Sequence, residues 1–385
     1  MDPSVAAYDL TPLLRMALLG VVIALGPLAW IWLRHRGAAP AARLRALTWL
    51  TLFLTFDLVL FGAFTRLTDS GLGCPDWPGC YGHASPLGAR DHIAAAQASL
   101  PTGPVTHGKA WVEMVHRYLA TAVGVLITVL AIAQWRLARR GAATLSPAWG
   151  AATLAWVCAQ GAFGALTVTM KLYPAIVTAH LLGGLGLLAL LAVQAVRLAP
   201  APLALSARQR AGVALVAALV VGQILLGGWV STNYAVLACT DFPTCQGRWW
   251  PAMDFDAAFS VRRPLGESAD GGYLPFAALT AIHMAHRLGA VVALAALLGL
   301  AWQLRSGGDP ALRRPAAALA GVAALQLATG LSNVVLGWPL LAAVAHTGGA
   351  ALLVVLLAML LARSAPRRVP AAPAGAGARA LGPAS

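Results

Sequence analysis

The sequence predicts an all-α polytopic membrane protein, in which one extra N-terminal transmembrane helix precedes two tandem, pseudo-symmetric four-helix transmembrane bundles. Composition is the first reason, since 59% of the residues are hydrophobic, only 10% are charged, and the mean hydropathy is +0.74. A soluble domain carries about 25% charged residues. The second reason is a series of nine long apolar segments, and the third is an internal repeat that relates the last eight of them.

Each of these segments is long enough for a transmembrane helix, which needs about 20 apolar residues. They cover residues 13–33, 46–66, 112–135, 148–170, 174–196, 211–232, 277–304, 315–336 and 340–362. The first is not a signal peptide, because Asp2 and Asp9 precede it and arginines follow it, the reverse of a secretory leader. We expect an N-terminal helix with an Arg-rich loop (1–45), a first bundle (46–200), a second bundle (201–362) and a disordered tail (363–385).

A duplication relates the two bundles. Cys74 and Cys80 recur as Cys239 and Cys245 at an offset of 165 residues, and two histidines follow each pair. The equivalent histidines are His116 with His286 and His180 with His346. Because each unit has an even number of spans, both copies insert the same way up around an axis along the membrane normal. This relation disfavours a transporter built from inverted repeats.

The net charge of +14 is concentrated on one side of the predicted membrane spans, so it does not indicate nucleic acid binding. Alternate loops and the tail hold most of the arginines, accompanied by the single acid Asp309. These are Arg34, Arg36, Arg43, Arg45, Arg136, Arg139, Arg140, Arg197, Arg208, Arg210, Arg305, Arg313, Arg314, Arg363, Arg367, Arg368 and Arg379. By the positive-inside rule this side is cytoplasmic. The N-terminus is then outside, the C-terminus inside, and both cysteine loops face the periplasmic or outer side.

The four repeated histidines are the main candidates for metal ligands. His116 and His286 lie near the outer ends of their spans, and His180 and His346 lie one to two turns inside theirs, so all four share the outer leaflet. A single intramembrane histidine is commonly a hydrogen-bonded packing residue. Four in register favour one bis-imidazole haem site in each bundle. A structural zinc site would want four ligands, more than either bundle supplies.

The two copies differ one helical turn before the first histidine. Glu113 precedes His116, while His283 occupies the matching place before His286. A carboxylate beside the first site is a candidate proton acceptor or relay, although an ordinary interfacial acid fits the same position. This asymmetry predicts that the first bundle is catalytic. His283 is expected to be an interfacial hydrogen-bonding residue.

Two arginines, Arg117 and Arg287, directly follow the first histidine of each copy. A guanidinium there can bind haem propionates through charge-assisted hydrogen bonds. It can equally snorkel to the membrane interface. Both interpretations are open.

Each cysteine pair has Cys-x5-Cys spacing in a loop that is expected to lie in an oxidising compartment, which favours disulfides Cys74 to Cys80 and Cys239 to Cys245. Free thiols or a redox-active dithiol are the alternative, because so short a loop gains limited entropic stabilisation. Cys158 lies alone in the fourth span and is expected to act as a small apolar residue.

Four further polar residues have no assigned function. Asp57 lies deep in the second span and is expected to face the bundle interior, because a charge in lipid is costly. His83, His92 and His107 fall in the long connection over 67–111 and are expected to be ordinary loop residues.

Five motifs resemble the haem A synthase family of bacterial cytoplasmic membranes. They lie at 65–78, 113–117, 178–181, 286–289 and 345–349, and the likeness covers roughly residues 46–362. It implies an oxidoreductase acting on a CH group. Such an enzyme converts the C8 methyl of haem O to the formyl group of haem A by two successive hydroxylations, with water as the oxygen source, for a haem-copper oxidase.

The resemblance also implies roles for single residues. His286 and His346 would ligate a haem b cofactor, His116 and His180 would bracket the haem O substrate, and Glu113 would be the catalytic acid or base. The family core has eight helices, so the span at 13–33 is additional.

The expected partners are haem O, the lipid membrane, an electron acceptor and a haem O synthase, and association into a homo-oligomer is open. Two other classes fit part of the sequence. A cytochrome b type electron carrier also uses bis-histidine haems, but it would place them toward opposite membrane faces. A membrane thiol-disulfide exchange protein explains the cysteine pairs but not the intramembrane histidines.

Overall fold

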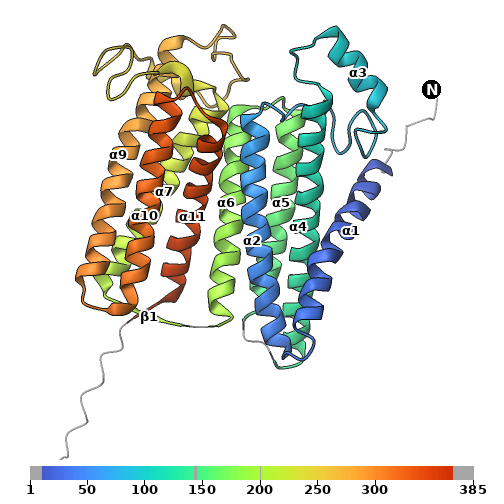
Figure 1. Ribbon diagram of the computed structural model, residues 1–385, viewed down its shortest axis with the longest axis vertical. Helices are drawn as coiled ribbons and strands as arrows, with labels where there is room; N and C mark the ends of the chain where they lie inside the picture. The colour runs from blue at the N-terminus through green and yellow to red at the C-terminus, as the bar shows by residue number, and fades with distance from the viewer. Residues whose placement is uncertain (1–10, 143–144, 200, 367–385) are drawn as a thin grey trace, which may run out of the picture.

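The computed structural model describes residues 11–142, 145–199 and 201–366, and within them nine helices are long and apolar enough to cross a membrane (Figure 1). They are α1 (Thr11–Arg34), α2 (Pro40–Leu67), α4 (His107–Arg139), α5 (Ala148–Thr169), α6 (Pro174–Arg197), α7 (Ala207–Thr232), α9 (Phe276–Ser306), α10 (Pro310–Val335) and α11 (Leu340–Arg363). The predicted fold class, an all-α polytopic membrane protein, is confirmed.

Local sequence explains where several of these helices begin. Proline stands at the first turn of α2, α6 and α10, where its missing N–H is not needed. Ser206 caps α7 through a reciprocal pair of hydrogen bonds with Gln209. Thr106 accepts a hydrogen bond from the backbone of Lys109 at the start of α4.

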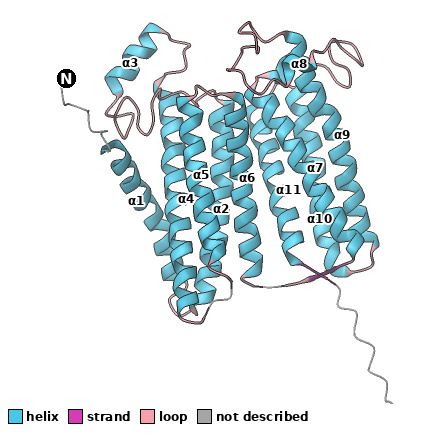
Figure 2. Cartoon of the chain, turned by 180° about the vertical axis from the view of Figure 1, so that it is seen from behind, coloured by secondary structure: helices cyan, strands magenta, loops and turns pink. Residues whose placement is uncertain are grey.

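Eight of the helices form two rings of four. In the first bundle α2, α4, α5 and α6 follow one another around the ring, and in the second bundle α7, α9, α10 and α11 do the same. The bundles meet where α2 and α6 pack against α7 and α11. The additional helix α1 packs along the outer side of α4, as Figures 1 and 2 show from opposite directions.

The pseudo-symmetry axis can be located from two contacts between the bundles. Arg66 donates to the carbonyl of Ser231 at 2.5 Å, and the Tyr234 hydroxyl donates to Asp69 at 2.6 Å. In both pairs the partners are 165 residues apart, the same offset as in the repeat. Residues equivalent under a two-fold relation contact each other only near its axis. The axis therefore passes between α2 and α7 at their C-terminal ends.

The long connections gather at this same end of the molecule. They contain the short elements α3 (Arg90–Ser99), η1 (Ala235–Ala238) and α8 (Phe255–Ala258). Two sequence expectations are wrong here, because His92 lies within α3 and His107 is the first residue of α4. The ring of His92 stacks on Tyr81 with a centroid separation of 5.3 Å.

The opposite end carries a short two-stranded sheet, in which β1 (Leu203–Leu205) pairs in parallel with β2 (Ser364–Pro366). The start of the predicted disordered tail is therefore ordered, because its backbone pairs with the linker between the bundles. The rest of that tail, 367–385, lies outside the described residues.

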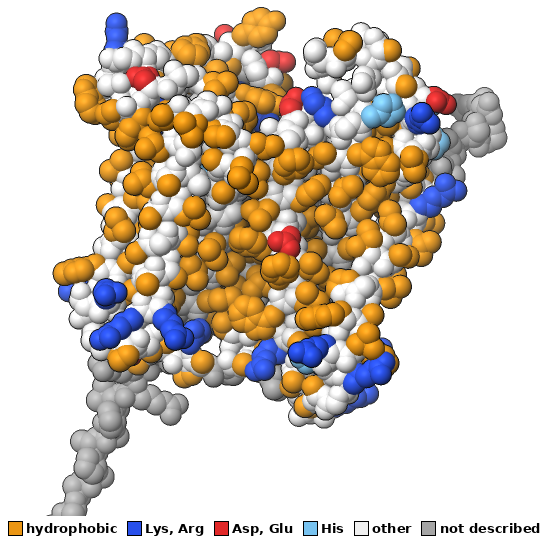
Figure 3. All heavy atoms as spheres, viewed as in Figure 1, with side chains coloured by type: hydrophobic (Ala, Val, Ile, Leu, Met, Phe, Trp, Pro, Cys, Tyr) orange, Lys and Arg blue, Asp and Glu red, His pale blue; other side chains and the backbone are white. Residues whose placement is uncertain are grey.

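Apolar side chains cover the helical faces, and Lys and Arg gather at the end away from the long connections (Figure 3). This is the charge pattern on which the predicted orientation depends. The prediction for Asp57 is wrong, since its side chain is exposed on the outer face of α2. It follows exposed Trp49 and Phe53 at intervals of four residues, so the helical phase that buries Thr48 and Thr55 turns Asp57 outward.

Candidate functional site

In each bundle the two repeated histidines lie on diagonally opposite helices. His116 is on α4 and His180 on α6, while His286 is on α9 and His346 on α11. All four side chains are part-buried. The two positions one turn nearer the loops are buried, Glu113 at 4% exposed and His283 at 4%.

A glycine faces each histidine from the remaining pair of helices. A Cβ atom at Gly62 on α2 would lie 3.0 Å from Nε2 of His116, and one at Gly227 on α7 would lie 3.0 Å from Cε1 of His286. The second diagonal repeats this arrangement, with Gly164 at 3.4 Å from His180 and Gly330 at 3.1 Å from His346. Any larger residue would fill the space beside the imidazole rings. Sequence reasoning missed these four glycines, although their matched spacing in the repeat was a usable signal.

In the second bundle the rings of His286 and His346 have centroids 6.5 Å apart with planes at 78°. Two imidazoles on one metal ion, with metal–nitrogen bonds of about 2 Å, have centroids roughly 6 Å apart. The spacing therefore suits an ion held between the rings. No cluster of three or more His, Cys, Asp or Glu that could hold a bare metal ion occurs in the described part of the chain. His286 and His346 would be the residues to hold a haem iron between them.

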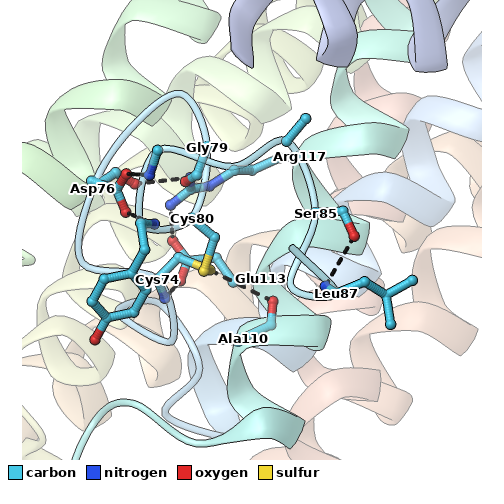
Figure 4. Close-up of a disulfide and its surroundings, with 12 residues drawn as sticks. Cys74, Asp76, Gly79, Cys80, Ser85, Leu87, Ala110, Glu113 and Arg117 are labelled. Atoms are coloured by element: carbon cyan, nitrogen blue, oxygen red, sulfur yellow. Dashed lines mark hydrogen bonds and ion pairs between the residues drawn. A yellow bond between two sulfur atoms is a disulfide. The ribbon is translucent and has the colours of Figure 1, made fainter. Parts of the chain in front are cut away.

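In the first bundle Glu113 connects the helix of His116 to the disulfide loop, as Figure 4 shows. Its carboxylate accepts a hydrogen bond from the backbone N–H of Cys74 at 2.7 Å and forms a buried ion pair with Arg117. The guanidinium of Arg117 also donates to the backbone carbonyls of Asp76 at 3.0 Å and Gly79 at 2.6 Å. Glu113 and Arg117 together fix the loop over the first site.

Arg287 holds the second loop in the same way. It donates to the carbonyls of Thr244 and Asp241 at 2.9 Å each and to that of Cys239 at 3.1 Å. Because His283 replaces Glu113, no carboxylate completes this arrangement, and Nδ1 of His283 has no hydrogen-bond partner among the described residues.

Of the two interpretations of these arginines, snorkelling is wrong for Arg117, whose side chain is only 8% exposed. Contact with propionates stays a prediction. Sequence reasoning missed the loop carbonyls as partners, because backbone acceptors leave no signature in a sequence.

The two cysteine loops share one backbone design. Disulfides join Cys74 to Cys80 and Cys239 to Cys245, and Cys158 is a free, exposed cysteine. An aspartate between each pair accepts hydrogen bonds from two backbone N–H groups just after the second cysteine. In the second loop the Thr244 hydroxyl also donates to Asp241 at 2.5 Å. Together with the N–H groups of Gly247 and Gln246 it lowers the pKa of Asp241 to about 2.

Comparisons with known proteins agree with this arrangement. Residues 45–358 match the model of the cytochrome oxidase assembly protein family COX15-CtaA. A haem A synthase of Shewanella oneidensis is 42% identical over 81% of this chain and 94% of its own length. Haem A synthases of Methylobacterium radiotolerans and Rhizorhabdus wittichii are each 30% identical, over 78% and 85% of this chain and 84% and 95% of their own lengths. The match spans both bundles, their histidines and their cysteine loops, so this chain belongs to the cytochrome oxidase assembly protein family.

Proposed function

We propose that this protein is a haem A synthase, an oxidoreductase that converts the C8 methyl of haem O to the formyl group of haem A for a haem-copper oxidase. The observation that carries the proposal is the repeated arrangement of two diagonal histidines, each faced by a glycine, in a family whose relatives bear that name. The repetition supplies two sites for one chemical class of ligand.

The two sites have different roles in this proposal. His286 and His346 hold a resident haem b, and His116 and His180 hold the substrate haem O. When bound, haem b supplies a one-electron carrier close to the substrate bundle. The glycines Gly227 and Gly330 leave room beside the second pair of rings, and Gly62 and Gly164 do so beside the first.

Oxidation of a methyl to a formyl group with oxygen from water releases four electrons and four protons. Glu113 is the group to which we assign proton transfer, since it lies one turn from His116 on the same helix face. Its ion pair with Arg117 and the Cys74 N–H keep the carboxylate oriented. The electrons require an acceptor outside the chain, which we propose to be a membrane redox carrier.

The proposed location is the bacterial cytoplasmic membrane, with the cysteine loops on the periplasmic or outer side. The gathering of Lys and Arg at the opposite end of the helices supports this orientation. A haem O synthase that delivers the substrate is a proposed partner.

The test is turnover by the purified protein supplied with haem O and an electron acceptor, with products identified by mass spectrometry. We expect haem A from the unaltered protein. His116→Ala should stop turnover while haem b is retained, and His286→Ala should lose haem b. Electron transfer through bound haem without any formyl product would support a cytochrome b type carrier instead. Loss of all activity on replacing the four loop cysteines, with haem retained, would support thiol-disulfide exchange.

A further inference from the structure

The two bundles differ in the groups that contact Nδ1 of their histidine rings. In the second bundle Gln223 on α7 contacts Nδ1 of His286 at 2.9 Å, and Thr329 on α10 contacts Nδ1 of His346 at 2.9 Å. The repeat places Leu58 and Phe163 at the matching positions of the first bundle, and neither side chain has a polar atom. Accordingly, Nδ1 of His180 is buried without a hydrogen-bond partner among the described residues.

Thr329 determines which nitrogen of His346 carries the proton. Its hydroxyl donates to the carbonyl of Leu325 at 2.7 Å, so the oxygen that faces His346 is free to accept. It therefore accepts the proton of Nδ1–H, which leaves the lone pair on Nε2. An imidazole in this form is ready to bind iron.

Gln223 contacts His286 in the opposite sense, because its amide nitrogen, a donor, faces Nδ1. Its Nε2 also donates to the His286 carbonyl at 3.0 Å, and its Oε1 is buried without a partner among the described residues. Turning the amide would set Oε1 against the His286 carbonyl, so Gln223 stays a donor toward this residue. The space for this side chain comes from Gly289, where a Cβ would lie 2.4 Å from Oε1. The first bundle has Leu119 at the position of Gly289, so glutamine and glycine of the second bundle replace two leucines together.

We propose that Thr329 is a positioning residue that fixes the ligating form of His346 and so helps the second bundle to retain a resident haem. The unassisted pair His116 and His180 binds its haem more weakly, as a site that must release product requires. Loss of the hydrogen bond made by the ring nitrogen that does not bind the metal typically weakens metal binding by about 10 to 100-fold. This inference rests on the proposed function, because it takes the second bundle to be the cofactor site.

The experiment uses the full chain reconstituted with haem b. Thr329→Val removes the hydroxyl at nearly constant shape, and we expect haem to transfer to an excess of a haem-scavenging protein about 10 to 100-fold faster. The midpoint potential should rise, because an imidazole without its Nδ1 hydrogen bond donates less electron density to ferric iron. Thr329→Ser should restore most of both properties.

The matched control is Ser332→Ala, since the Ser332 hydroxyl on the same helix donates to a carbonyl at 2.8 Å but is not bonded to a histidine. It should behave as the unaltered protein. If Thr329→Val behaves like this control, or Thr329→Ser fails to rescue, the positioning role is overturned. If His346→Ala keeps haem b as tightly as the unaltered protein, the cofactor site itself is misassigned and the proposed function fails at that point.

Discussion

The two bundles have the same ring order, the same diagonal histidines and the same facing glycines, yet the groups around those histidines differ. The first bundle has a buried carboxylate, Glu113, paired with Arg117 beneath its disulfide loop. The second has Gln223 and Thr329 against its imidazole rings and no carboxylate under its loop. One copy thus adds a buried ion pair beneath its loop, and the other adds polar groups that contact the imidazole rings.

Under the proposed function, this difference would let a duplicated bundle acquire two roles without a change of architecture. Both copies keep the diagonal histidines and the glycines that face them. The positions that diverge lie next to the histidines, where we expect them to change how firmly a ligand is held or what chemistry occurs beside it. The largest expected difference between the bundles is therefore at Arg117 and Arg287, which are equivalent in the repeat but differ in their hydrogen-bond partners.

Arg117→Ala should destabilise the protein more than Arg287→Ala. Removal of Arg117 leaves the Glu113 carboxylate buried and unpaired, and breaking a buried ion pair in this way costs about 3 to 5 kcal/mol. Among the described residues Arg287 donates its hydrogen bonds to backbone carbonyls and forms no buried ion pair, so its removal should cost about 2 kcal/mol. Thermal unfolding of the purified variants in detergent measures both effects. The double variant Arg117→Ala with Glu113→Gln should recover part of the loss, and equal midpoints for the two single variants would contradict this account.

Much of the architecture could be predicted because its signals are long and repeated. Nine apolar segments and a nearly constant offset locate the helices, the paired cysteines and the equivalence of His116 with His286. Which face of each helix is buried was harder to predict from the sequence. Asp57 was expected inside because a charge in lipid is costly, but one charged residue does not override the phase set by the other side chains of α2.

The surroundings of the site were predicted least well. Thr329 and His346 lie on different helices, and nothing in either segment alone indicates that they meet. Arg117 contacts backbone carbonyls, which every residue possesses. The paired exchange of Leu58 and Leu119 for Gln223 and Gly289 is visible in the repeat, but only the structure shows that the two positions touch.

Filling the space beside the histidines should separate their ligand role from general packing. Gly330→Val places a side chain against His346, and overpacking of this kind costs about 1 to 3 kcal/mol, or roughly 5 to 150-fold in haem affinity. The matched control is Gly321→Val on the same helix, where a Cβ meets nothing within 4 Å. Haem b content after purification and a spectral titration check both variants. Gly164→Val should leave haem b content unchanged and should lower substrate binding instead, and a loss of haem b there would show that the two sites are not separate.

The smallest expected effect concerns the loops at low pH. Hydrogen bonds from Thr244, Gly247 and Gln246 lower the pKa of Asp241 to about 2, so they stabilise the folded loop fully above its ordinary pKa of 3.8. That stabilisation is lost as the pH falls from about 4 toward 2, because protonation removes the charged acceptor. Hydrogen exchange of the Gln246 and Gly247 amides, expressed relative to their intrinsic rates, should show protection that declines over this interval. Asp241→Asn, which carries no titrating group, should show weaker protection that does not change with pH. Were the asparagine variant to lose protection over the same interval, another group would control the loop, and the turn around Asp241 would not explain its acid sensitivity.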